Sequence, residues 1–117
     1  MMMNLLFWVM SCRFMRLIVF FDLPSVTTSD LRQYRKFRKY LIKNGFIMMQ
    51  ESIYSRLIIN NSSASLVKKD LLQNLPKTGL VQLMSVTEKQ YSNIEYLVGK
   101  SKSSVINSTD RVVKIWN

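Results

Sequence analysis

The feature that most constrains the fold is the apolar run "MRLIVFFD" at residues 15–22. Its length and its branched and aromatic side chains predict a β-strand. Because no polar residue alternates with the apolar ones from Leu17 to Phe21, we expect this strand to be buried on both faces and to lie inside a sheet. Asp22 ends the run just before the turn "LPS" at 23–25, although the chain has only seven acidic residues.

A helix is predicted over residues 30–45, "DLRQYRKFRKYLIKNG". Four apolar side chains recur on one side at the helical spacing, namely Leu31, Tyr34, Phe37 and Leu41. Thr27 and Asp30 have the spacing of a capping box, and Gly45 is a typical helix stop.

The rest of the chain predicts further short elements. Residues 46–61 indicate two strands joined around 50–52, residues 62–75 a second helix, and residues 79–86 another strand. "TEKQ" at 87–90 is a second capping box that opens a short helical turn. The order β-α-β-β-α-β predicts an α+β, ferredoxin-like fold with both helices on one face of an antiparallel sheet.

Two leftover apolar segments, "YLVG" at 96–99 and "RVVKIW" at 111–116, are additional strand candidates. We expect these C-terminal strands to add to the sheet edge of a second copy and so to form a homodimer.

The composition excludes several kinds of chemistry. The chain has no histidine and a single cysteine, Cys12, which excludes histidine-based catalysis, Cys-type zinc sites and an internal disulfide. It also has no glycine-rich phosphate-binding motif. A lone cysteine fits a reducing, cytoplasmic location, and the net charge of +10 predicts a polyanionic partner such as nucleic acid.

The opening residues "MMMNLLFWVMSC" are apolar, but no positive segment precedes them, as a signal peptide would require. Arg13 and Arg16 would lie in the middle of any membrane span that continued further. We therefore expect residues 1–9 to be a disordered or upstream-start extension, residues 10–117 to form a single domain, and no membrane partner.

Five cations are predicted to gather in one arc of about 100° on the first helix. These residues are Arg32, Arg35, Lys36, Lys39 and Lys43. Arg38 falls near Leu31 instead and flanks the apolar side. The arc is either a solvated helix face or a surface for nucleic-acid phosphates; the second reading is favoured because no acid separates these cations and they repel one another. Such contacts would not depend on base sequence.

Three segments carry a family resemblance: "MRLIVFFDLP" at 15–24, "YRKFRKYLIKNGFIMMQESIYSRL" at 34–57 and "GLVQLMSVTEKQYSNIEYLVG" at 79–99. From Met10 to Trp116 the chain resembles the CRISPR-associated protein two family, with members from type II-A systems most similar. The resemblance implies a small ferredoxin-like homodimer between two dimers of the CRISPR integrase, CRISPR-associated protein one. That assembly holds double-stranded spacer DNA for integration into the CRISPR array.

Many family members are also metal-dependent endonucleases that cleave single-stranded RNA or double-stranded DNA. The resemblance implies that Asp22 is the catalytic metal ligand, for Mg²⁺ or another divalent cation. Mg²⁺ uses one or two carboxylates with waters and substrate phosphates, and a two-fold axis near Asp22 would supply a second copy of it. The alternative is that Asp22 merely ends its strand and hydrogen-bonds the following turn.

Two positions, Met48 and Tyr54, bear on the proposed nuclease activity. Met48 stands where some relatives carry a basic residue, which weakens the case for robust cleavage. Tyr54 occupies an aromatic position of the family, and core packing or a hydroxyl bonded to backbone explains it better than catalysis.

Two other functions stay open: a free-standing magnesium-dependent endoribonuclease, and a basic RNA-binding ferredoxin-like module unrelated to CRISPR.

Overall fold

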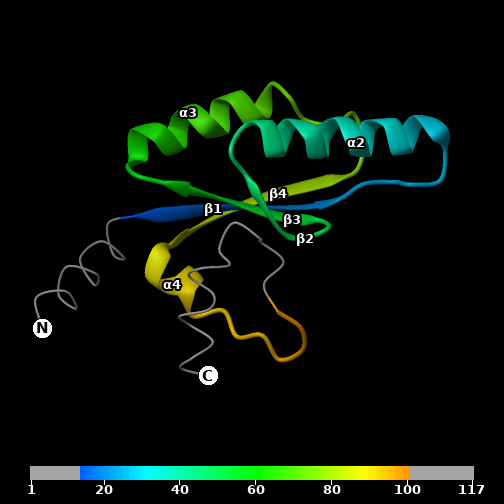
Figure 1. Cartoon of the computed structure of the whole chain (residues 1–117). Helices are drawn as coiled ribbons and strands as arrows, with labels where there is room; N and C mark the ends of the chain where they lie inside the picture. The colour runs from blue at the N-terminus through cyan, green and yellow to red at the C-terminus, as the bar shows by residue number, and fades with distance from the viewer. Residues whose placement is uncertain (1–13, 101–117) are drawn as a thin grey trace, which may run out of the picture.

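The computed structural model describes residues 14–100, so the predictions for residues 1–9, Cys12 and the strand at 111–116 lie outside it. The strands are β1 (Met15–Asp22), β2 (Ile47–Gln50), β3 (Ile53–Ile58) and β4 (Leu80–Thr87), and the helices are α2 (Thr28–Lys43), α3 (Asn61–Leu72) and α4 (Glu88–Ser92). The sheet is antiparallel, with the order β2-β3-β1-β4. Helices α2 and α3 cover one of its faces (Figure 1). The predicted α+β, ferredoxin-like architecture is confirmed.

Strand β1 lies inside the sheet, as its apolar run predicts. It pairs with β3 on one side and β4 on the other, so that Val19 stands opposite both Tyr54 and Leu83. Val19 belongs to the core beneath the helices, whereas Ile18, which points to the other face, is also 95% hidden from solvent, with 5% exposed. Burial on both faces at the strand centre therefore explains why polar residues do not alternate there.

The core forms between the sheet and the two long helices. Phe37 and Leu41 are the buried residues of α2, and Val67 and Leu71 are those of α3. They pack on the side of the sheet that carries Tyr54, in one cluster. The helical spacing read from the sequence therefore selects the correct face of α2, although Leu31 at its first turn is 38% exposed.

Both predicted capping boxes form. Thr27 and Asp30 exchange backbone-to-side-chain hydrogen bonds of 3.0 Å, and Thr87 and Gln90 exchange bonds of 2.9 and 3.0 Å at the start of α4. Helix α3 begins one residue earlier than predicted because Asn60, rather than a serine, caps it.

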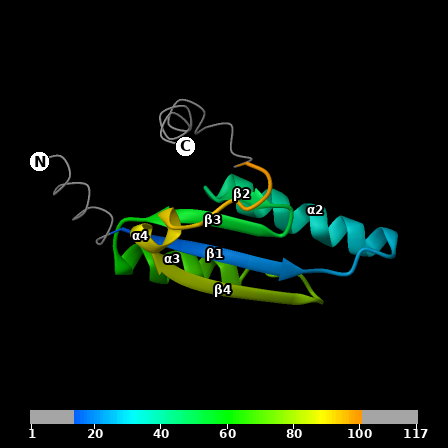
Figure 2. The same ribbon diagram turned by 90° about the horizontal axis from the view of Figure 1, so that it is seen from below.

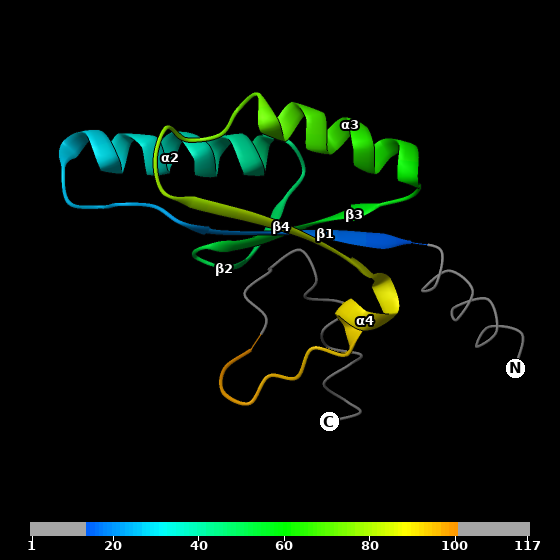
Figure 3. The ribbon, with the colours of Figure 1, turned by 180° about the vertical axis from the view of Figure 1, so that it is seen from behind.

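Helix α4 lies on the sheet face opposite α2 and α3 (Figures 2 and 3). Arg16 of β1 holds it there, since its Nε is 2.7 Å from Glu88 Oε2 and its guanidinium lies 4.3 Å from the centre of the Tyr91 ring. The Ser55 hydroxyl in turn donates to the Tyr91 hydroxyl at 3.3 Å. This network covers one end of the open face.

Residues 96–99, predicted to be a strand that pairs with a second copy, form no strand within the single chain. This segment is irregular, and Leu97 and Val98 are 88% and 94% exposed. A strand needs a neighbour for its backbone hydrogen bonds, and residues 14–100 offer this segment none.

No helix among residues 14–100 is long and apolar enough to cross a bilayer.

Candidate functional site

Asp22 is the last residue of β1 and its side chain is exposed. The strand alternation places it on the open face, since Phe21 faces the helices. Its carboxylate makes no hydrogen bond or ion pair with any residue in the range 14–100. The turn "LPS" is therefore not its hydrogen-bond partner, and the carboxylate remains available to a ligand.

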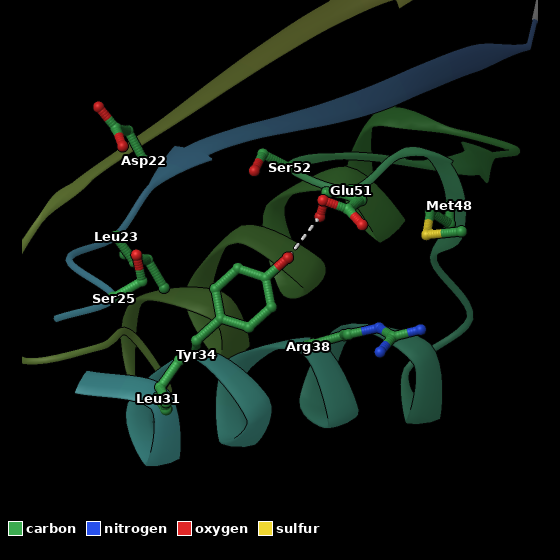
Figure 4. A pocket seen from close by; sticks show the side chains of 9 residues that line it. All are labelled: Asp22, Leu23, Ser25, Leu31, Tyr34, Arg38, Met48, Glu51 and Ser52. Carbon is green, nitrogen blue, oxygen red and sulfur yellow. Dashed lines mark hydrogen bonds between the residues drawn. The ribbon is translucent and has the colours of Figure 1, made fainter. Parts of the chain in front are cut away.

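A cavity of about 470 Å³ opens beside Asp22, between the end of β1, helix α2 and the β2–β3 turn. Its apolar walls are Leu23, Leu31, Tyr34 and Met48. Figure 4 shows the Tyr34 ring standing between α2 and the β2–β3 turn. The cavity is therefore formed by segments far apart in the sequence.

Polar side chains surround the same cavity. Asp22 and Ser25 come from the end of β1 and the loop after it, Arg38 comes from α2, and Glu51 and Ser52 come from the β2–β3 turn. In Figure 4 the Asp22 carboxylate points away from Tyr34 and Arg38, so it lies at the rim rather than inside.

Two of the lining side chains are held by hydrogen bonds. The Tyr34 hydroxyl donates to the backbone oxygen of Glu51 at 3.1 Å, and Arg38 Nε donates to the Tyr54 hydroxyl at 3.1 Å. Burial raises the pKa of Tyr34, and the neighbouring Tyr54 and Glu51 act in the same direction. Tyr34 is therefore a neutral donor over the physiological pH range.

The buried position of Tyr54 confirms that it packs in the core, since it is 0% exposed. Its hydroxyl, however, meets the Arg38 side chain and not a backbone group. Tyr54 therefore acts on the cavity only indirectly, by positioning Arg38.

The donor chemistry at Asp22 fits a hard cation such as Mg²⁺, which keeps several waters and uses few protein carboxylates. Within the described part of the chain, no three acidic or cysteine side chains come together as a ready metal cage. One copy thus offers Asp22 at the rim, with Glu51 and Ser52 lining the same cavity. Water, substrate or a second copy would have to supply the remaining ligands.

The structure places the five cations of the predicted arc, Arg32, Arg35, Lys36, Lys39 and Lys43, at exposed positions of α2. None of them lines the cavity beside Asp22. The predicted site residues therefore form two separate parts, a carboxylate at a strand end and a cationic helix face.

The sequence reading missed the cavity itself. Tyr34 and Arg38 are one helical turn apart and therefore lie on the same side of α2. The sequence already placed Arg38 beside Leu31 and outside the arc, and this position could have indicated that Arg38 lies near Tyr34. Nothing in the sequence pattern indicated that Glu51 and Ser52 would face these two residues.

A family model described as CRISPR associated protein Cas2 matches residues 15–94, which include every described strand and helix. The chain belongs to the Cas2 family. A relative from Treponema denticola, named CRISPR-associated endoribonuclease Cas2, is 48% identical over 99 residues, which cover 85% of this chain and 98% of the relative. A relative of the same name from Streptococcus mutans is 46% identical over 99 residues, 85% of this chain and 91% of the relative.

The crystal structure of Streptococcus pyogenes Cas2 has the same fold, with a TM-score of 0.56 and 18% identity. The match covers 71% of this chain and 99% of that chain. Membership in the Cas2 family removes the alternative of an RNA-binding module unrelated to CRISPR.

Proposed function

We propose that this chain acts in CRISPR spacer acquisition as a homodimer that bridges dimers of the integrase, CRISPR-associated protein one, and binds double-stranded spacer DNA. The observation that carries the proposal is the cationic face of α2, the arc defined above. All five of its side chains are exposed, while the buried residues of the helix, Phe37 and Leu41, lie on its other side.

The dimensions of this face suit a nucleic-acid backbone. Helix α2 has 16 residues, which is about 24 Å, and phosphates follow one another every 3.4 Å or so along a strand. The arc itself runs from Arg32 to Lys43, about 18 Å of the helix, and could therefore follow about five phosphates. No acidic residue lies between Asp30 and Glu51 to neutralise these cations, so an anionic partner relieves their mutual repulsion.

The open face of the sheet supports the homodimer. Leu57, Leu80 and Met84 are 42%, 54% and 45% exposed there, and the segment with Leu97 and Val98 leaves further apolar surface uncovered. Burial of such surface against a second copy is favourable. Asp22 points to this same face, so an isologous contact whose two-fold axis passes near the end of β1 would bring two Asp22 carboxylates toward each other.

As a second activity we propose metal-dependent cleavage of RNA or DNA at Asp22, the activity that the names of the relatives contain for RNA. Asp22 would hold Mg²⁺ or another divalent cation at the rim of the cavity. When bound, such an ion polarises a phosphate and lowers the pKa of water. Met48 occupies the position that is basic in some relatives, so we expect weak cleavage.

Duplex binding at increasing salt tests the principal role of the arc. We expect Arg35→Glu with Lys39→Glu to weaken duplex binding whatever the base sequence, and to reduce the slope of log K against log salt by about two, because fewer counterions are released. Lys68→Glu with Lys69→Glu on α3 is the matched control, with the same change of charge on another exposed helix. Equal effects of the two pairs would mean that the arc is only a solvated face.

A further inference from the structure

We propose that the contacts of Arg16 with Glu88 and Tyr91 form a clamp that directs residues 93–100 away from their own sheet and onto the sheet edge of a second copy. The inference rests on the homodimer of the proposed function. It deepens that function by naming the residues that decide between pairing within one chain and pairing between two. Arg16 is a positioning residue in this role, because it acts through helix α4.

The chain changes direction where β4 ends. Thr87 is both the last residue of β4 and the N-cap of α4, so no loop separates the strand from the helix. Strand β4 is an edge of the sheet, since the strand order is β2-β3-β1-β4. A chain that continued through a short hairpin loop would return along this free edge and pair with its own β4. Helix α4 takes the place of such a loop.

Two kinds of contact join Arg16 to α4. Its Nε and Nη2 donate to the two carboxylate oxygens of Glu88 at 2.7 and 3.1 Å, and the two side chains are only 16% and 23% exposed. Its guanidinium also lies 4.3 Å from the centre of the Tyr91 ring. A bidentate pair of this kind fixes the geometry of both partners, and partial burial reduces its screening by salt. Both ends of the five-residue helix are thus bound to one residue of β1.

The position of Tyr91 shows in which direction α4 extends from the end of β4. Its ring covers Arg16 of β1, and its hydroxyl accepts a hydrogen bond of 3.3 Å from Ser55 of β3. Helix α4 therefore lies over β1 and β3, inward from the free edge of β4 (Figure 2). The segment that follows, yellow to orange in Figure 2, continues toward the side of β2.

The way back to the free edge of β4 is too long for the connection after α4. A strand on that edge would lie two strand spacings from β1, which is about 10 Å. Residues 93–95 span at most about 10 Å when fully extended, so they could not also reverse the direction of the chain. Residues 96–99 therefore cannot pair with their own β4 while the clamp holds α4 in place.

The apolar side chains of this segment still favour burial. Leu97 and Val98 are 88% and 94% exposed, and residues 14–100 offer the segment no strand partner. A second copy presents the same β4 edge without the restriction on chain length, and an added strand would satisfy the unpaired backbone groups of that edge. In an isologous pair each copy would give its segment to the other. The clamp thus favours exchange between two copies over closure within one.

Sedimentation equilibrium of the full chain tests the role of the clamp. We expect Glu88→Gln to raise the dissociation constant of the dimer about tenfold, the effect of losing one charge-assisted contact. Arg16→Gln should raise it at least as much, and adding Glu88→Gln to Arg16→Gln should change nothing further, because both remove the same contact. Glu95→Gln is the matched control. Glu95 is exposed and makes no hydrogen bond or ion pair among residues 14–100, so we expect no effect.

Hydrogen exchange separates the clamp from a general loss of stability. In the unmodified dimer the amides of residues 96–99 should be protected. In Glu88→Gln at the same concentration this protection should fall, while the amides at the centres of β1 and β3 keep theirs. Equal losses in the segment and in these strands, an unchanged dissociation constant, or an equal effect of Glu95→Gln would overturn the inference. If the unmodified protein is a monomer at micromolar concentration, the proposed homodimer is itself wrong, and the clamp is overturned with it.

Discussion

Gly79 lies directly against the backbone of Asp22. A Cβ at position 79 would stand 2.8 Å from the Asp22 carbonyl oxygen and 3.2 Å from the Cα of Leu23. Gly79 also has a φ of +99°, in the region that L side chains rarely adopt. The chain entering β4 can therefore approach the end of β1 this closely only because residue 79 has no side chain, and this contact helps to position Asp22.

We expect Gly79→Ala to lower the free energy of unfolding by about 2 kcal/mol or more, since a left-handed backbone strain adds to a clash with backbone atoms. Gly45→Ala is the matched control. Gly45 has a φ of +87°, but the nearest atom to its Cβ would be 3.6 Å away, in Arg56. It should therefore suffer the backbone strain alone, about 1 kcal/mol. Urea unfolding measures the free energy of unfolding of both variants. Equal losses of stability in Gly79→Ala and Gly45→Ala would show that the close contact between Gly79 and Asp22 is unimportant.

Asp22→Asn separates the two proposed activities. The side chain is exposed, so we expect stability to change by less than about 0.5 kcal/mol. Metal-dependent cleavage should fall by orders of magnitude, because the amide is a poor ligand for a hard cation and the chain has no histidine to replace it. Spacer integration should persist, since the integrase performs that chemistry in the proposed assembly. Glu95→Gln, the same change at another exposed carboxylate, is the control.

The outcomes of that experiment discriminate between the candidate functions. Loss of cleavage with integration retained supports an architectural subunit that has a separable nuclease site. Loss of both activities would mean that the metal site serves acquisition. If the protein cleaves RNA in a cell that lacks the integrase, and Asp22 is needed only for that cleavage, the free-standing endoribonuclease is favoured. Cleavage that survives in highly purified Asp22→Asn protein would contradict the assignment of Asp22.

The exposed apolar groups of the open face predict a homodimer in solution. Light scattering or analytical ultracentrifugation at micromolar concentration should give twice the chain mass. Met84→Glu, which places a charge on that face at the edge strand β4, should shift the equilibrium toward monomer because an unpaired charge is costly to bury. We also expect deletion of residues 110–117 to weaken the dimer. A stable monomer before any change would contradict both the dimer and a paired Asp22 site.

Tyr40 predicts a loss of stability at high pH. Its hydroxyl donates to the Asp70 carboxylate and joins α2 to α3. Burial, followed by Asp70, raises the pKa of Tyr40 from 10.0 to about 12. Since the folded pKa exceeds the unfolded value, the contribution of Tyr40 is fully present below about pH 10 and is lost as the pH rises toward 12. The difference in unfolding free energy between the unmodified protein and Tyr40→Phe should shrink in this range. A difference that stays constant up to pH 11 would contradict this.

Local chemistry explains what could be read from the sequence. The apolar run at 15–22 requires an interior strand, both capping boxes depend on residues three apart, and the cationic arc follows from the 3.6-residue period of a helix. Each of these features involves side chains within one element. They therefore emerge in the structure at the predicted places, apart from shifts of a few residues at helix ends.

Contacts between elements were decided only by the tertiary structure. The cavity depends on the β2–β3 turn bringing Glu51 over Tyr34 and beside Arg38, and the position of Asp22 depends on the close approach of Gly79. Residues 96–99 form no strand in the single chain for a related reason, because β-structure is stable only beside a partner edge. By itself the sequence determined the elements of the β-α-β-β-α-β order and which of their faces are apolar, charged or acidic. Packing determined which of those faces meet. The spacing of apolar and charged residues along one element describes that element alone and does not specify its distance from another.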